Sequence, residues 1–224
     1  MTASDILPDL GAAIRLLTAG GVLIFPTETF YAAGCLVRDA RAVSRIYALK
    51  ARGRGRPLPL VAASAEQAGE TLDLRALPES LAAFWPGPLT VLLPLSAEKP
   101  PLPEALVNQA NEAAVRVSPN PTARALAAGA GGLLTASSAN ISGCAPACRC
   151  EDLDPRFRAR LSALDVPFGI LPAQGEAEQP EGGLPSTIVR PVRTQKGACA
   201  LRVLRHGAIA DAELEKAGFA LLPG

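Results

Sequence analysis

The chain has 224 residues, of which 49% are hydrophobic and 19% charged, so it can bury the core of one sizeable domain or two small ones. The formal net charge is only +1, which excludes a globally basic nucleic-acid-binding protein but is compatible with a local basic patch. Aromatic residues make up 4% of the chain, so we expect no broad surface for stacking nucleic-acid bases.

The first quarter of the chain predicts helices that alternate with short strands. Apolar residues at helical spacing predict helices over residues 6–19 and 40–50, the second with one apolar and one basic face. Short apolar runs over residues 22–25 and 57–62 are typical of buried strands, and Pro26 ends the first of them.

The rest of the chain predicts more strands than helices. Residues 67–84 indicate one or two helices and residues 121–129 another, with a rigid turn over residues 85–88 between them. Further strands are expected at residues 89–95, 113–117, 133–136, 186–190 and 201–205. Because helices and strands alternate irregularly, we predict an α/β (α+β) domain with a mixed sheet.

The domain organisation is predicted to be simple. Residues 174–183 are acidic and contain Gly and Pro, so we interpret them as a surface loop and not as a linker between domains. We predict one domain over residues 1–209 and a short C-terminal tail over residues 210–224.

The apolar runs are too short for a membrane span, which needs roughly 20 residues. The N-terminus shows no basic segment followed by an apolar stretch, so we expect no signal peptide. Without one, the odd set of five cysteines is interpreted as reduced thiols. We therefore predict a cytoplasmic protein that makes no contact with a membrane.

The first candidate site is a basic run from Arg38 to Arg56, which has seven cationic residues and one acid, Asp39. Guanidinium groups match phosphate oxygens in a bidentate manner, and Gly53 and Gly55 let backbone amides approach an anion. The run predicts a site for a polyphosphate or a nucleic acid. The alternative is a solvated helix face followed by a flexible loop.

Polar residues follow two of the predicted strands, at residues 26–29 and 137–143. Such positions suit ligand contacts, although a turn or a helix N-cap explains the first equally well. The chain's only histidine, His206, is far along the chain from these serines, so a Ser-His-Asp hydrolase is not favoured. Cys144, Cys148 and Cys150 match no zinc signature well and are interpreted as incidental thiols.

Seven blocks in a fixed order carry more information than any one motif. They cover residues 25–31, 49–52 with 57–58, 84–90, 114–117, 138–143, 186–189 and 203–205. They include a K-x-R motif at Lys50 and Arg52 and an S-x-N motif at Ser138 and Asn140. In this order the blocks resemble the YrdC family of threonylcarbamoyl-adenylate synthases, over about residues 10–209.

The resemblance implies a fold and a reaction. The fold is an open twisted mixed sheet with flanking helices around a deep basic cavity. The reaction converts L-threonine, bicarbonate or CO2, and ATP to threonylcarbamoyl-AMP and pyrophosphate, with Mg2+ on the phosphates. In the family, a tRNA-threonylcarbamoyl transferase complex then modifies tRNA to carry N6-threonylcarbamoyladenosine. The chain stops soon after Ile209, so it resembles the short, single-domain bacterial type.

The resemblance also assigns residues, because the reaction needs positioning and charge neutralisation more than a protein nucleophile. Lys50 and Arg52 are the implied catalytic residues. The implied ATP-binding residues are Lys50, Arg52, Arg54, Ser138, Asn140 and Arg205. The implied threonine-binding residues are Thr27, Tyr31, Arg116, Ser138 and Ser186, with Arg116 suited to clamp the carboxylate.

Two other functions are kept as alternatives. One is a YrdC-like RNA-binding protein, and the other is a related enzyme that forms a different carbamoyl-adenylate. The basic run from Arg38 to Arg56 motivates the first, because it is suited to contact tRNA or other RNA. The chain also departs from the family where Gly53 replaces a proline after the K-x-R motif, which predicts a looser loop.

Overall fold

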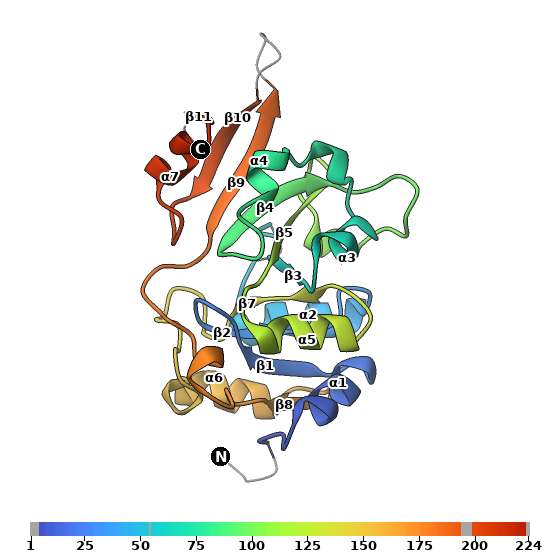
Figure 1. Ribbon diagram of the computed structural model, residues 1–224. Helices are drawn as coiled ribbons and strands as arrows, with labels where there is room; N and C mark the ends of the chain where they lie inside the picture. The colour runs from blue at the N-terminus through green and yellow to red at the C-terminus, as the bar shows by residue number, and fades with distance from the viewer. Residues whose placement is uncertain (1–4, 54, 194–198, 223–224) are drawn as a thin grey trace.

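The computed structural model describes residues 5–53, 55–193 and 199–222, in which helices and strands alternate irregularly along the chain (Figure 1). The strands are β1 (Val22–Pro26), β2 (Tyr31–Gly34), β3 (Leu60–Ala62), β4 (Leu89–Pro94), β5 (Glu112–Val117), β6 (Leu134–Thr135), β7 (Ser137–Ser138), β8 (Phe168–Ile170), β9 (Thr187–Arg193), β10 (Cys199–Arg205) and β11 (Ala220–Leu222). The helices are α1 (Leu10–Thr18), α2 (Ala40–Lys50), α3 (Ala65–Gly69), α4 (Glu79–Ala82), α5 (Pro121–Gly129), α6 (Pro155–Ser162) and α7 (Asp211–Lys216).

The strands form two mixed sheets. One sheet has four strands in the order β7-β2-β1-β8, with β1 antiparallel to β2 and parallel to β8. The other has seven strands in the order β11-β10-β9-β4-β5-β3-β6, in which β4 is antiparallel to β5 and parallel to β9. The predicted α/β class with a mixed sheet is thereby confirmed.

Strand β1 is buried on both faces, which explains why its sequence is apolar without alternation. Successive side chains point to opposite sides of a strand. Leu23 and Phe25 accordingly pack in the cluster that contains Leu17 of α1, whereas Ile24 packs in the cluster that contains Ile46 of α2. The β1 end that leads to the polar residues after Pro26 is therefore held rigidly.

Local capping and proline positions explain where several elements begin. Helix α1 begins at Leu10, later than predicted, because the Asp9 carboxylate caps it by accepting a hydrogen bond of 2.7 Å from the Ala12 amide. Helix α2 has its predicted bounds and is capped in the same way by Asp39. Strand β3 is shorter than predicted, since Pro59 has no N–H to donate to a ladder.

The segment predicted as a C-terminal tail contains regular structure up to residue 222. Helix α7 buries Leu214, and β11 pairs in parallel with β10 at the edge of the larger sheet. Phe219 is also buried in the main core cluster. These residues pack as part of the sheet, and a domain boundary at residue 209 stays a prediction.

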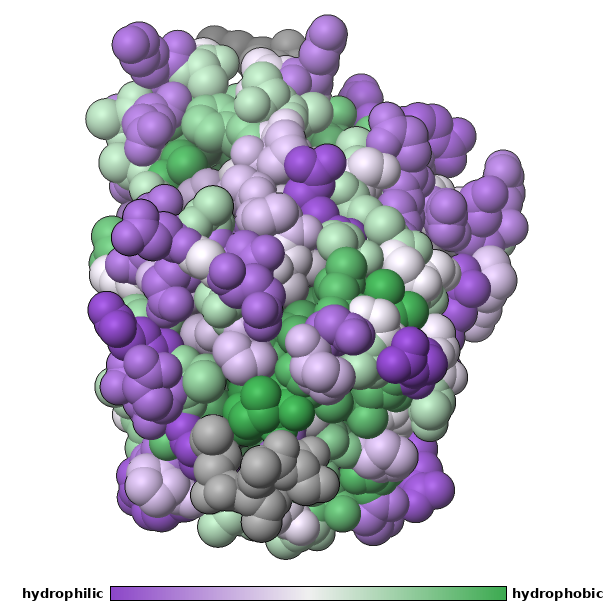
Figure 2. All heavy atoms as spheres, turned by 60° about the horizontal axis from the view of Figure 1, so that its bottom comes forward, coloured by the Kyte–Doolittle hydropathy of each residue, from purple (hydrophilic) through white to green (hydrophobic). Residues whose placement is uncertain are grey.

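No helix in the described ranges is long and apolar enough to cross a membrane. Figure 2 turns the end of the molecule that lies at the bottom of Figure 1 toward the viewer and shows apolar side chains between polar ones. Among the described residues, the exposed large apolar side chains are Leu10, Leu184 and Leu204.

Candidate functional site

Two adjoining cavities bring together residues from both sheets. Cavity A has a volume of about 450 Å³, and Arg116, Ser186 and Arg205 are among its lining residues. Cavity B has a volume of about 610 Å³, and Lys50 and Arg56 are among its lining residues. The two cavities share the lining residues Arg52, Ser138 and Asn140.

Lys50 links the K-x-R motif to the S-x-N motif. It is the last residue of α2, it is 2% exposed, and its Nζ donates to the Asn140 carbonyl at 2.9 Å and to Asn140 Oδ1 at 3.2 Å. The same Nζ also donates to the Ser138 carbonyl, and Ser138 Oγ donates to Asn140 Oδ1 at 2.6 Å. The two motifs therefore form one hydrogen-bonded cluster.

The charge on Lys50 is sensitive to pH. Burial, and secondarily the nearby Arg52 guanidinium, lower the pKa of Lys50 from 10.5 to about 7. Near neutral pH the side chain therefore exchanges between an ammonium and a neutral amine. A bound polyanion would favour the ammonium, because opposite charge stabilises the protonated form.

A residue with a left-handed backbone conformation turns the chain from the end of α2 toward the cavities. Ala51, at the C-cap of α2, has φ of 49° and ends the helix directly after Lys50. The Arg52 Nε then donates to the Arg56 carbonyl at 3.0 Å, and burial lowers the pKa of Arg52. The turn thus places Lys50 and Arg52 at adjoining positions of the same site. Arg54 lies outside the described residues.

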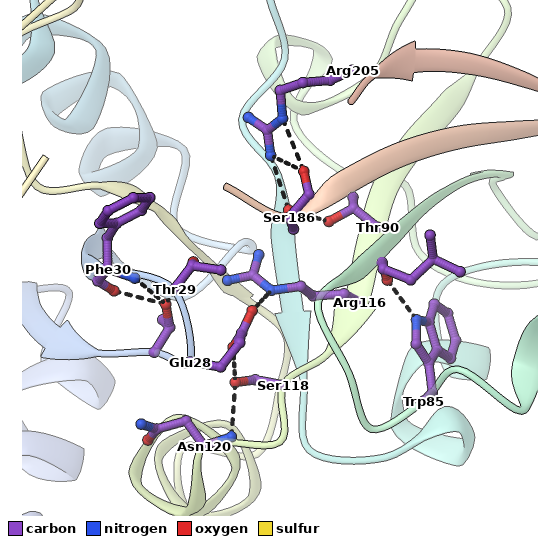
Figure 3. Close-up of polar contacts among 12 residues, drawn as sticks. Glu28, Thr29, Phe30, Trp85, Thr90, Arg116, Ser118, Asn120, Ser186 and Arg205 are labelled. Atoms are coloured by element: carbon purple, nitrogen blue, oxygen red, sulfur yellow. Dashed lines mark hydrogen bonds and ion pairs between the residues drawn. The ribbon is translucent and has the colours of Figure 1, made fainter. Parts of the chain in front are cut away.

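Arg116 lies on β5 and forms a buried ion pair with Glu28, from the loop between β1 and β2 (Figure 3). The Arg116 Nε donates to Glu28 Oε1 at 2.8 Å, and Ser118 Oγ donates to Glu28 Oε2. The side chains of Arg116 and Glu28 are 4% and 8% exposed. Since Arg116 lines cavity A and Glu28 does not, the pair presents its guanidinium group at the cavity wall.

Arg205 fixes Ser186 at the opposite side of the drawn site (Figure 3). Its Nη2 donates to the Ser186 carbonyl at 2.7 Å and to Ser186 Oγ at 2.9 Å, and Thr90 Oγ1 lies 2.9 Å from that hydroxyl. A register shift in β10 between Val203 and Arg205 turns Arg205 toward the cavity. Arg52, Arg116 and Arg205 all line cavity A, and burial, together with the charges of Arg116 and Arg52, lowers the pKa of Arg205 to about 10.

Two predicted threonine-binding residues have other partners. Thr27 lines cavity A, but its hydroxyl donates to the Phe30 carbonyl at 2.7 Å and so stabilises the turn. Tyr31 does not line cavity A or B, and its hydroxyl accepts a hydrogen bond of 2.8 Å from the Ala173 amide. Ala32 lines cavity A, and neighbouring residues of a strand point to opposite faces, so Tyr31 points away.

The structure brings most of the predicted site residues together and adds residues that hold them in place. Lys50, Arg52, Ser138, Asn140, Arg116, Ser186 and Arg205 are brought together as predicted. Glu28 lies in the polar run 26–29 that was considered for ligand contacts, but Glu28, Ser118 and Thr90 were not assigned to bind either substrate. One signal was available for Glu28, because an arginine within an apolar strand needs a buried acid as its partner.

The remaining candidate groups lie elsewhere or are unreactive. All five cysteines are free, and burial raises the pKa of the Cys35 thiol to about 12, so it stays protonated. His206 is exposed and pairs with Asp211 at 3.0 Å. In the described ranges, no group of three or more His, Cys, Asp or Glu side chains is arranged to hold a metal ion.

Known proteins resemble this chain in sequence. The family model Sua5_yciO_yrdC, whose description is telomere recombination, matches residues 15–207. A threonylcarbamoyl-AMP synthase of Xylella fastidiosa (strain M12) is 38% identical over 165 residues, which cover 71% of this chain and 87% of the relative. A threonylcarbamoyl-AMP synthase of Xanthomonas campestris pv. campestris (strain B100) is 35% identical over 161 residues, which cover 70% and 84%.

Solved structures resemble it in fold. P. abyssi Sua5 complexed with L-threonine superposes with a TM-score of 0.77 at 26% identity, covering 96% of this chain and 60% of that chain. The chain thus spans about 60% of the length of that Sua5. E. coli YciO has a TM-score of 0.68 at 21% identity, covering 93% of this chain and 95% of YciO, and it supports the fold alone.

Proposed function

The chain belongs to the Sua5_yciO_yrdC family, and from this premise we propose that it is a threonylcarbamoyl-AMP synthase. The resemblance to the YrdC family that the sequence predicts is thereby confirmed. In the proposed reaction, the amino group of L-threonine attacks bicarbonate with loss of water, or CO2 with loss of a proton, to give a carbamate. A carbamate oxygen then attacks the α-phosphorus of ATP, and pyrophosphate leaves.

One observation carries this proposal: the K-x-R and S-x-N side chains meet between two cavities, one suited to ATP and the other to L-threonine. Lys50 and Arg52 supply the positive charge that a triphosphate needs in cavity B. Arg116 and Ser186 supply a guanidinium and a hydroxyl for a small amino acid in cavity A. No protein nucleophile is required, so catalysis comes from positioning and from neutralising developing charge.

We infer that magnesium is brought to the site by the nucleotide. The described part of the chain has no cluster of three acidic, histidine or cysteine residues suited to a metal. Glu28, the buried acid beside cavity A, has both carboxylate oxygens engaged by Arg116 and Ser118. We infer that Mg2+ enters as the Mg-ATP substrate, held by phosphate oxygens and water.

The basic run from Arg38 to Arg56 has two kinds of cation. Arg41 and Arg45 lie on the surface and pair with Asp165, whereas Lys50 and Arg52 line the cavities. The pairing lowers the free positive charge on the helix surface, so the structure favours the enzyme over an RNA-binding protein. Direct tRNA contact by this run, and transfer of the product to a tRNA-threonylcarbamoyl transferase complex, stay predictions.

Pyrophosphate release tests the proposed function. Purified protein with Mg-ATP, L-threonine and bicarbonate is expected to release pyrophosphate, and omission of any one of the three is expected to stop the release. L-Serine and L-valine serve as matched amino acids that each lack part of the threonine side chain. Equal turnover without an amino acid, or salt-sensitive RNA binding with no turnover, would contradict the proposal.

ATP binding is expected to weaken as the pH rises above 7. Lys50, whose pKa is about 7 in the free protein, becomes neutral above that pH, and ATP must restore the proton to regain the charge. The Kd for ATP should therefore rise about tenfold per pH unit between pH 7.5 and 9. Over this range the phosphates of ATP no longer titrate, because a phosphate group has a pKa of about 6.

Calorimetry in two buffers of different ionisation enthalpy measures this effect. At pH 8 we expect uptake of close to one proton per ATP bound by the wild type, and none by Lys50→Met. A Kd that does not change with pH, or equal proton uptake by both proteins, would show that Lys50 is not the titrating group.

A further inference from the structure

The ion pair between Glu28 and Arg116 spans the two sheets at the wall of cavity A. Glu28 follows β1 of the smaller sheet, and Arg116 lies on β5 of the larger sheet. Ser118, two residues after Arg116, projects from the same side of the extended chain and reaches the second carboxylate oxygen. Both oxygens of the Glu28 carboxylate thus accept hydrogen bonds, one from Arg116 on β5 and one from Ser118 just after β5.

The backbone around Glu28 is also fixed. Its carbonyl accepts a hydrogen bond of 3.0 Å from the Glu181 amide, and the carbonyl of Thr29 accepts one of 2.9 Å from the Gly182 amide. On the other side, Ser118 Oγ accepts a hydrogen bond of 3.2 Å from the Asn120 amide at the N-cap of α5. Neither end of the ion pair can therefore turn freely.

The pairing determines which edge of the Arg116 guanidinium faces cavity A. Glu28 engages Nε, and the two Nη groups make no hydrogen bond to any residue in the described ranges. A guanidinium binds a carboxylate most specifically through two parallel N–H groups. With Nε engaged, the Nη1 and Nη2 pair is the edge left for an incoming carboxylate.

We propose that Glu28, supported by Ser118, is a positioning residue that orients Arg116 to bind the carboxylate of the amino-acid substrate. This inference rests on the proposed function. Glu28 does not itself line cavity A, so it acts through Arg116 and not by contact with the substrate. It also offsets one of the three guanidinium charges around that cavity, those of Arg52, Arg116 and Arg205.

The chain contains a matched control on the same strand. Glu112 of β5 accepts a hydrogen bond of 2.8 Å from the Arg190 Nε, the same atoms and distance as in the Glu28 pair. The Arg190 and Glu112 side chains are 38% and 11% exposed, and neither residue lines cavity A or B. Replacing Glu112 therefore removes a similar ion pair without altering the site.

Glu28→Gln tests the proposal, because it keeps the side-chain shape and removes the charge. The KM and the calorimetric Kd for L-threonine are expected to rise roughly tenfold or more, while the KM for ATP changes less than about twofold. Ser118→Ala should also raise the KM and the Kd for L-threonine, by a smaller factor, and should change the KM for ATP less than about twofold. Glu112→Gln should leave both KM values unchanged, and thermal melts should show that each variant is folded.

The outcomes separate the two hypotheses. If the wild type releases no pyrophosphate and binds no L-threonine, the proposed function fails and this inference fails with it. If the wild type is active but Glu28→Gln and Ser118→Ala keep its threonine KM, the function stands and the positioning role is overturned. Equal rises in the KM for both substrates would also overturn it, since they indicate a structural role.

Discussion

Replacing Lys50 by methionine is expected to lower kcat/KM for ATP by about 100- to 1,000-fold. Lys50 contributes a positive charge inside a largely buried cluster, where it is screened less by water than a surface charge is. The substitution keeps the length and the apolar stem of the side chain but removes the ammonium. Pyrophosphate release at varied ATP concentration measures the loss.

The effect of Lys50→Met should be confined to the use of ATP and should leave the binding of L-threonine intact. Cavity A is lined by Arg116 and Ser186 and not by Lys50, so L-threonine should still raise the Tm of Lys50→Met. Arg41→Met is the matched control, because Arg41 belongs to the same helix and the same basic run but lies exposed beside Asp165. Equal losses in the two variants would mean that the run acts through its overall charge and that Lys50 has no specific role.

The Lys50 cluster shows how local and long-range information differ. The Asp39 cap and the bounds of α2 could be predicted from neighbouring residues, and they place Lys50 at the end of the helix. Its partner Asn140 is 90 positions away in sequence. Periodicity carries no information about such a contact, so only the ordered motifs of the family could indicate it.

Elements with weak apolar patterns were not predicted. Helix α6 has three arginines among its eight residues, and only Phe157 and Leu161, four residues apart, are buried. Strand β8 has three residues and is stabilised by parallel pairing with β1, far away in the chain. In both cases tertiary packing forms the element, and propensity within a short window is too weak to detect it.

The sequence alone allowed only part of the charge pattern to be interpreted. The concentration of cations between Arg38 and Arg56 indicated a positively charged site, and Lys50 and Arg52 of this run line the cavities. It could not indicate that Asp165 neutralises part of the run on the surface. The same holds for the pair of Glu28 with Arg116, whose members are 88 positions apart.

Replacing Arg116 by lysine is expected to raise the KM for L-threonine by roughly 100-fold, while kcat/KM for ATP at saturating L-threonine changes little. Lysine keeps the positive charge, so Glu28 is not left as an unpaired buried carboxylate. It has a single ammonium in place of the planar fork, and it cannot hold Glu28 and a substrate carboxylate in the same geometry. Steady-state kinetics with each substrate varied in turn measures this split.

L-Threoninol, in which a CH2OH group replaces the carboxylate, separates a carboxylate clamp from a general loss of the site. The wild type should prefer L-threonine over L-threoninol by at least about 100-fold, since the alcohol offers no carboxylate to the two Nη groups of the buried Arg116. Arg116→Lys should reduce that preference, because the variant binds L-threonine more weakly and loses little affinity for L-threoninol. If the variant weakened binding of both compounds equally, Arg116 would be shaping the cavity and another residue would bind the carboxylate.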